Sequence, residues 1–190
     1  MLALSRAVLD RTDLASAATP FLEKLAVDPG TCAFVALIRG PQVYVVARRE
    51  APGGVSVTIR VGYQYPLTWG SMGKAILAFL PEPEREALLA GPDLFLYGDT
   101  KGKAVDLDAA RRELEVCSRL GYCTDLGHIQ PGLQAASAPL LGGRVVRRPV
   151  GVVTVFGTFP PEEIAVHGER VAATAREISD RLSLLLDGMV

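Results

Sequence analysis

The feature of this sequence that most constrains its fold is a long amphipathic segment near the C-terminal end. After Pro160 and Pro161, apolar residues recur at steps of seven, four, three, four and three, which is the spacing of one helix face. These apolar positions are Ile164, Val171, Ala175, Ile178, Leu182 and Leu185. A stripe of this length must be covered by a sheet or by another subunit.

Strand-like runs elsewhere in the chain predict such a sheet. The apolar runs 32–38 and 43–47 are separated by a short Gly-Pro turn, which predicts a β-hairpin. A third run, 55–61, alternates β-branched residues with smaller or polar ones, and we expect a third antiparallel strand there. The run 150–157 is typical of a buried strand.

Helical spacing or helix-ending residues mark the other segments. We expect helices at 9–28 (with a kink or restart where Thr19 caps Pro20), at 70–80, at Glu82–Leu89, and from an Asp106 cap to Gly121. Residues 93–105 are predicted to form a surface loop, and 133–141 is a run of small residues. Helices around an antiparallel sheet make the expected fold class α/β, in the α+β sense.

Charge and length exclude several classes of protein. The chain has 190 residues, 49% of them hydrophobic, and a formal net charge of -1, so we expect neither disorder nor strong nucleic-acid binding by this chain. No apolar run reaches the roughly 18–20 residues of a membrane span, and the first residues do not resemble a signal peptide. We therefore expect a cytoplasmic location and no membrane partner.

Groups that could support catalysis or bind a metal are few. The chain has two histidines: His128 lies in a glycine-rich loop, where a pocket role is open, and His167 lies in the last helix, where we expect it to be exposed. There is no Gly-x-Ser-x-Gly elbow, and Cys117 and Cys123 do not have the spacing of a metal clamp. We expect no enzyme, cofactor, metal site or disulfide framework, and Cys117 is interpreted as a small buried hydrophobe.

The segment from Gly70 to Lys74 is rich in glycine and starts a predicted helix. It fails as a phosphate-binding loop, because Thr68 and Ala75 stand where that motif needs a glycine and a hydroxyl residue. Its exposed backbone N–H groups and the helix dipole would still suit a carboxylate. The alternative is that the glycines only let the helix pack closely on the sheet.

The order and spacing of several short motifs resemble the effector-binding domain of IclR-family transcriptional regulators. They are Val61-Gly62, Tyr65-Pro66-Leu67, Gly73-Lys74-Ala75-Ile76-Leu77-Ala78-Phe79-Leu80-Pro81, Leu120-Gly121-Tyr122, Pro131-Gly132-Leu133, Ala135-Ala136-Ser137-Ala138-Pro139-Leu140 and Val155-Phe156-Gly157. The resemblance extends over about residues 14–186.

The resemblance implies a GAF-like domain, an antiparallel sheet flanked by helices, that binds a small organic effector. Residues 1–28 would be a linker or N-terminal helix and 29–190 the effector domain, which would associate as a dimer or tetramer. DNA would be bound only through a winged helix-turn-helix domain that this chain lacks. Two alternatives stay open: a GAF-like module of another signalling protein, and an enzyme acting on a small organic acid, with Asp125 and His128 as its acid/base pair.

By motif position, the resemblance implies a pocket at Ser71, Met72, Asp125, Ala135, Thr154 and Phe156. Two features depart from the family pattern: Trp69 and Gly70 stand before the helix, and His128 stands where an acidic residue is usual. An indole, a histidine and a helix start together favour a carboxylic acid that is aromatic or similarly flat. The alternative is that Trp69 belongs to the core and His128 to a solvated loop.

Overall fold

The computed structural model describes residues 11–53, 59–98, 104–142 and 148–187. Within these ranges, the strands form one antiparallel sheet in the order β3-β2-β1-β6-β5-β4. The strands are β1 (Thr31–Arg39), β2 (Gln42–Glu50), β3 (Gln64–Pro66), β4 (Cys123–Leu126), β5 (Gln134–Gly142) and β6 (Arg148–Gly157). The α+β class and the antiparallel sheet are therefore as predicted.

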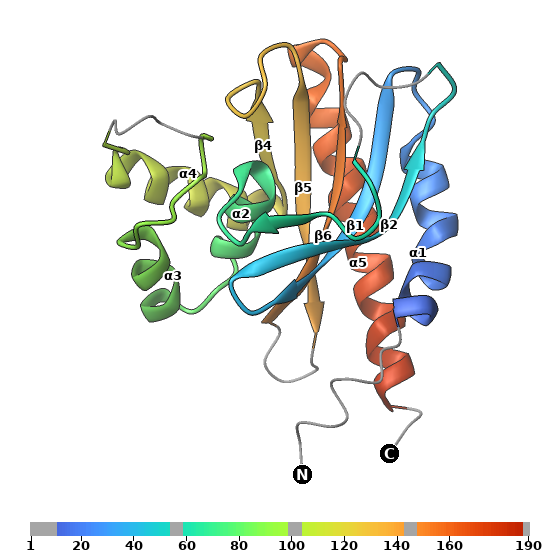
Figure 1. Cartoon of the computed structure of the whole chain (residues 1–190), viewed down its shortest axis with the longest axis horizontal. Coiled ribbons are helices and arrows are strands. Elements are labelled where there is room, and N and C mark those ends of the chain that lie inside the picture. Colours follow the sequence, from blue (N-terminus) through green and yellow to red (C-terminus); the bar gives the residue numbers. More distant parts are fainter. Residues whose placement is uncertain (1–10, 54–58, 99–103, 143–147, 188–190) are drawn as a thin grey trace.

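Helices cover both faces of the sheet (Figure 1). On one face lie α1 (Arg11–Leu25) and α5 (Ile164–Asp187), and α5 follows the short 3-10 helix η1 (Pro161–Glu163). On the other face α2 (Gly70–Leu77) contacts the sheet, with α3 (Glu82–Leu89) and α4 (Leu107–Leu120) outside it. None of the described helices combines the length and apolarity needed to cross a bilayer.

The middle of the apolar stripe of α5, from Val171 to Ile178, is covered by the chain's own sheet and by α1. Val171, Ala175 and Ile178 are almost fully buried in one core with residues of α1, β5 and β6. The sequence left open whether a sheet or another subunit covers the stripe. Over these three positions it is the sheet. Burial of a side chain as large as that of Val171 or Ile178 contributes roughly 1.5–3 kcal/mol. These contributions hold α5 against the sheet.

Two of the three predicted strand regions are confirmed. The hairpin is β1–β2, with Gly40 in its turn at φ 60°, a conformation that favours glycine. The buried strand is β6, which lies at the centre of the sheet between β1 and β5 and is buried over residues 151–157. A strand covered on both sides carries a continuous apolar run, which is why periodicity identified it.

The third predicted strand, 55–61, is not observed as predicted. Residues 55–58 lie outside the described part of the chain, and residues 59–61 are not in a strand. The edge strand is instead β3, which follows a turn at Gly62 with φ 93° and ends at Pro66. An edge position suits Pro66, which has no backbone N–H, because an edge strand pairs with a neighbour on one side only.

The sequence failed to identify β4 and β5 as strands. Alanine, serine and glycine have low strand propensity, so the small-residue run predicts little on its own. Its pairing partners impose the strand: β5 runs between β6 and β4. Pro139 is tolerated because β4 pairs only with residues 134–137, so the missing N–H disturbs no bond on that side.

Helix α1 is continuous through Pro20, so of the predicted kink or restart, the restart is wrong. Thr19 does not cap a helix; its hydroxyl donates to the carbonyl oxygen of Ala15 at 2.8 Å. Ala18 and Leu22 flank the proline and are fully buried, so packing against the sheet offsets the lost backbone bond. The helix ends at Leu25, three residues before the predicted end.

The other helices start and stop close to the predicted signals. The Asp106 carboxylate accepts the Ala109 N–H at 2.9 Å, and Gly121 ends α4 at φ 82°. Helix α2 ends at Leu77, three residues before the predicted end, and Pro81 is the N-cap of α3. The predicted cap residues of α4 are therefore confirmed.

Three expectations about burial and bonding are wrong. The predicted surface loop enters the core at Leu96, which is fully buried; residues 99–103 of that loop lie outside the described part. His167 is buried and stacks on Phe159 with 3.9 Å between ring centroids, instead of being exposed. Cys117 is buried as predicted, but it forms a disulfide with Cys123, although no disulfide framework was expected.

Candidate functional site

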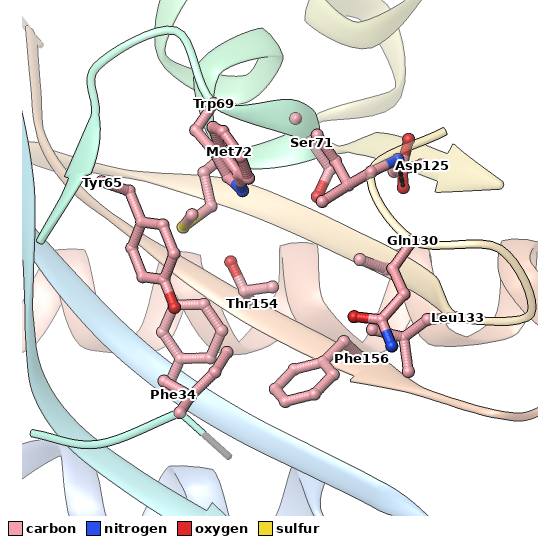
Figure 2. Close-up of a pocket in the computed structure, with 14 residues that line it drawn as sticks. Phe34, Tyr65, Trp69, Ser71, Met72, Asp125, Gln130, Leu133, Thr154 and Phe156 are labelled. Atoms are coloured by element: carbon pink, nitrogen blue, oxygen red, sulfur yellow. Dashed lines mark hydrogen bonds between the residues drawn. The ribbon is translucent and has the colours of Figure 1, made fainter. Parts of the chain in front are cut away.

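A cavity of about 180 Å³ lies between the sheet and the first turn of α2 (Figure 2). Eight of the nine residues that the sequence singled out line it. They are Trp69, Gly70, Ser71, Met72, Asp125, Ala135, Thr154 and Phe156. The ninth, His128, does not line the cavity. Residues from α2, β4, β5 and β6 thus meet at one place, although more than 80 positions separate the first from the last.

The first turn of α2 contributes Ser71 and Met72, with their backbone N–H groups, to the lining of this cavity. Gly70 donates its N–H to the carbonyl oxygen of Phe95 at 3.0 Å. The N–H groups of Ser71 and Met72, next in the turn, have no acceptor among the residues that the structure describes. Both residues are buried, and a buried backbone N–H that lacks an acceptor is costly, which favours a ligand acceptor beside them.

Glycine is required at two positions for this helix start. Gly70 has φ 52°, and a Cβ there would lie 2.9 Å from the Ile129 side chain. A Cβ on Gly73 would lie 2.2 Å from the carbonyl carbon of Thr68, a backbone atom that cannot move aside. The glycines therefore let α2 turn tightly over the cavity, so both the packing interpretation and the open anion site are compatible with the structure.

A chain of buried hydroxyls continues from the helix start. The Ser71 hydroxyl lies 2.9 Å from that of Ser137, which lies 2.8 Å from the hydroxyl of Thr154. All three residues are buried. Each hydroxyl can rotate to donate or accept, so the chain can adapt to a ligand that offers either a donor or an acceptor.

Asp125 places a carboxylate on the same side of the cavity as the Ser71 hydroxyl, and this residue is only 3% exposed. Its Oδ1 atom lies 3.2 Å from Nδ1 of His128, and its Oδ2 atom accepts the Ile129 N–H at 3.2 Å. The His128 side chain is 52% exposed and meets the Tyr97 ring edge-on at 5.6 Å between centroids. His128 thus contacts Asp125 from outside the cavity.

The opposite wall is apolar and largely aromatic. Trp69 lies 6.0 Å from Tyr65 and 6.0 Å from Phe95, measured between ring centroids. Phe34 and Phe156 meet edge to face at 6.0 Å. In Figure 2 the rings of Tyr65, Phe34 and Phe156 lie across the cavity from Ser71 and Asp125, and the Trp69 ring lies beside Met72. Burial raises the pKa of Tyr65 above its usual value, so its hydroxyl keeps its proton at neutral pH.

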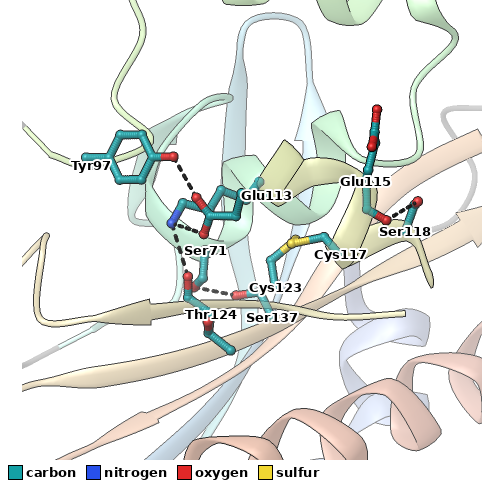
Figure 3. The surroundings of a disulfide bond; sticks show 10 residues. Ser71, Tyr97, Glu113, Glu115, Cys117, Ser118, Cys123, Thr124 and Ser137 are labelled. Carbon is teal, nitrogen blue, oxygen red and sulfur yellow. Dashed lines mark hydrogen bonds and ion pairs between the residues drawn. A yellow bond between two sulfur atoms is a disulfide. The ribbon is translucent and has the colours of Figure 1, made fainter. Parts of the chain in front are cut away.

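A buried ion pair fixes α2 against its neighbours (Figure 3). Lys74 is 1% exposed, and its Nζ donates to Glu113 Oε1 at 2.7 Å and to the carbonyl oxygen of Thr124 at 3.2 Å. The Nζ atom also lies 4.4 Å from the centre of the Tyr97 ring, whose hydroxyl donates to Glu113 Oε2 at 2.6 Å. Burial and the neighbouring Glu113 raise the pKa of Tyr97. This network joins α2 to α4 and β4.

Sequence reasoning assigned no role to six further residues that line the cavity. They are Phe34, Ile59, Tyr65, Ile129, Gln130 and Leu133. Phe34 lies directly opposite Thr154 in the β1–β6 ladder, so the strand register would have identified it. A single sequence does not fix that register. Tyr65 and Leu133 lie inside motifs quoted in the sequence analysis. Their position within these motifs could have identified them as lining residues.

The donor set does not favour a metal. Among the described residues, no group of three or more histidine, cysteine or acidic side chains gathers in one place. The cavity itself contains one carboxylate, Asp125, together with hydroxyls and backbone donors. This is the donor set of a site for a small organic molecule with one polar end.

Comparison with known proteins agrees with this architecture. The family model described as "Bacterial transcriptional regulator IclR C-terminal" matches residues 6–180. The HTH-type transcriptional repressor AllR of Klebsiella pneumoniae is 26% identical over 184 residues, which cover 95% of this chain and 66% of AllR. The chain therefore spans slightly less than two thirds of the length of this curated relative.

Solved structures share the fold. HmgR of Pseudomonas aeruginosa is 32% identical with a TM-score of 0.67, covering 96% of this chain and 70% of HmgR. An IclR homolog of Microbacterium hydrocarbonoxydans, solved with 4-hydroxybenzoate, is 23% identical with a TM-score of 0.72, covering 91% of this chain and 69% of that one. With the family match over most of its length, the chain belongs to the IclR family of bacterial transcriptional regulators, as the C-terminal, effector-binding domain.

Proposed function

We propose that the cavity binds a small aromatic carboxylic acid as its effector. The observation that carries this proposal is the polarity of the cavity: Ser71 and Met72, with their unpaired N–H groups, lie at one end, and the rings of Tyr65, Phe34 and Phe156 lie across the cavity from them. The carboxylate would accept from the two N–H groups at the positive end of α2, and the ring would lie against the aromatic wall.

The size of the cavity supports one substituted ring. An engineered cavity of roughly 150 Å³ lined by apolar side chains holds benzene, and this cavity measures about 180 Å³. The difference leaves room for a carboxylate or a hydroxyl group. The homolog solved with 4-hydroxybenzoate offers a first compound to try, because that molecule has the proposed shape.

Asp125 would select among acids. Its carboxylate faces the cavity and is already hydrogen-bonded to Ile129. Asp125 lies on the same side as Ser71, so the ligand carboxylate held at the α2 start already meets some like charge, and a second carboxylate would add to it, whereas a ligand hydroxyl could donate to Asp125. We therefore expect monocarboxylates, with or without a hydroxyl, to bind better than dicarboxylates of the same ring.

The effector would act by changing how a longer regulator binds DNA, through a winged-helix domain linked to this one. Ligand binding can shift an equilibrium between two states only if the ligand prefers one of them.

The domain would act in the cytoplasm as a dimer or tetramer. Exposed apolar side chains on α4, Val116 at 43% and Leu120 at 52%, offer contact area. A monomer mass that is independent of concentration would contradict the assembly.

An enzymatic role is not part of this proposal. Asp125 and His128 are in contact, but His128 does not reach the cavity, and both Asp125 oxygens already have partners. A general acid or base must come within hydrogen-bond reach of the substrate, and His128 does not meet that condition here.

A thermal-shift panel tests the proposal. Benzoate and 4-hydroxybenzoate should raise the melting temperature, since a ligand that binds only the folded state stabilises it. The matched amides, benzamide and 4-hydroxybenzamide, should raise it less, because they lack the charge that the α2 start favours. Equal shifts for acids and amides would contradict the proposed carboxylate position, and no shift with any ring compound would contradict the aromatic effector.

A further inference from the structure

We propose that Cys117 and Cys123 form a reversible redox modification site whose state changes the effector cavity. The two cysteines join the end of α4 to the start of β4 by a disulfide, with 5.0 Å between their Cα atoms. That spacing lies within the range in which a disulfide forms without moving the backbone. The effect on effector binding rests on the proposed function, whereas the modification itself does not.

The disulfide lies beside residues that build the cavity (Figure 3). Cys123 is followed directly by Thr124, whose carbonyl oxygen accepts Lys74 Nζ, and then by Asp125, which lines the cavity. Four residues before Cys117, Glu113 accepts the other bond from the same Nζ. The disulfide and the Lys74 bridge therefore join the same two elements, α4 and β4.

Opening the disulfide increases the separation that the two buried sulfurs need. Bonded sulfurs lie about 2.05 Å apart, whereas non-bonded heavy atoms keep roughly 3.5 Å or more. Cys117 is 4% exposed and Cys123 is 1% exposed, so the thiols must be accommodated by moving α4 relative to β4. Such a movement would change the geometry around Lys74, which is part of α2, and around Asp125.

A reductant can reach the buried disulfide by local opening. Cys117 lies in the last turn of α4, and the three residues that follow it, 118–120, are exposed. Helix ends fray at lower free energy than the core unfolds, and fraying of this turn would uncover the Cys117 sulfur. In a reducing compartment the pair would be open most of the time and would close when oxidant rises.

The chemistry balances with ordinary thiol reagents. In reduction, a thiolate of a dithiol attacks one sulfur, the Cys117–Cys123 bond breaks, and the second thiol of the reagent releases the mixed disulfide; two cysteine thiols and one oxidised reagent result. In closure, oxidised glutathione accepts the two electrons and leaves as two glutathione thiols. Effector binding must then shift this redox equilibrium by the same factor by which the redox state shifts effector affinity.

Hydrogen exchange in a Cys32→Ala background tests the proposal. This change removes the third thiol, so every alkylated cysteine counted by mass belongs to the pair. The protein is prepared with oxidised glutathione or with dithiothreitol, and exchange is measured for the cysteine-free segment 65–77, which includes α2. We expect faster exchange of this segment in the reduced form and in a Cys117→Ser/Cys123→Ser variant. Equal exchange in the two states, or failure of the pair to close with oxidised glutathione, would overturn the proposal.

Titration of both forms with 4-hydroxybenzoate separates this inference from the proposed function. We expect the two dissociation constants to differ by about fivefold or more, the lower end of typical coupling between sites. If exchange changes with redox state but neither form binds any aromatic acid, the effector assignment fails and the redox site stands. If both forms bind with equal affinity and equal exchange, the redox site fails and the effector assignment stands.

Discussion

The ion pair between buried Lys74 and partly exposed Glu113 predicts an unequal response to the loss of each partner. Lys74 is 1% exposed and the Glu113 side chain is 34% exposed. If Lys74 is replaced by methionine, Glu113 can turn to water and the apolar stem is kept. If Glu113 is replaced by alanine, an ammonium group remains buried, with only the Thr124 carbonyl and the Tyr97 ring as partners.

The magnitudes follow from these contacts. Lys74→Met loses two hydrogen bonds donated by the ammonium group, partly offset by rehydration of Glu113, so we expect a loss of about 2 kcal/mol in the free energy of unfolding. Glu113→Ala leaves an uncompensated buried charge, for which losses of roughly 3–5 kcal/mol are typical. The double variant removes both charges and should resemble Lys74→Met, which makes it more stable than Glu113→Ala alone.

Urea unfolding followed by circular dichroism measures all three variants, with similar m-values required for a fair comparison. The reasoning is refuted if Glu113→Ala is less damaging than Lys74→Met, or if the double variant loses the sum of the two single losses. Either result would mean that Lys74 is hydrated or otherwise paired in solution.

Three further outcomes are expected. Gly73→Ala should cost about 2 kcal/mol or more, since its Cβ would meet the Thr68 backbone at 2.2 Å; a urea midpoint equal to that of the wild type would contradict this. Burial, with a smaller contribution from Arg170, lowers the pKa of His167 below its usual 6.5, so the unfolded chain binds the proton first and stability should fall as the pH drops below about 6.5. His167→Phe should reduce that fall, as followed by melting temperature against pH. Ser71→Ala keeps the backbone N–H and should weaken 4-hydroxybenzoate only a few-fold, whereas Ser71→Pro removes a donor to a charged group and should weaken it roughly tenfold or more by calorimetry.

Sequence reasoning worked best where local chemistry decides the structure. The Asp106 cap, the Gly121 helix end and the continuous apolar run of β6 each depend on a few adjacent residues, and each is observed. It failed where distant partners decide: β5 is a strand because β6 and β4 flank it, and Pro20 is tolerated in α1 because its neighbours are buried.

In the candidate site, too, residues in a local motif could be predicted, whereas residues placed by distant partners could not. The glycine-rich start of α2 identified Ser71 and Met72 by local motif, and both line the cavity. Phe34 and Gln130 could not be identified, because the first depends on the β1–β6 register and the second on the path of a loop. Burial of His167 and the closeness of Cys117 to Cys123 also depend on how helices meet other elements, which no local pattern encodes.

The central claim is that an aromatic acid occupies the cavity with its ring against Trp69, and the fluorescence of this residue tests it most directly. Trp69 is the only tryptophan of the chain, so its emission reports on the cavity alone. Titration with 4-hydroxybenzoate, or with whichever acid of the panel stabilises the domain most, should shift the emission and reduce acrylamide quenching in a saturable way. Ser71→Pro should move the midpoint to higher concentration. An acid that raises the melting temperature but leaves Trp69 emission and quenching unchanged would show that it binds elsewhere, and the account of the cavity would be wrong.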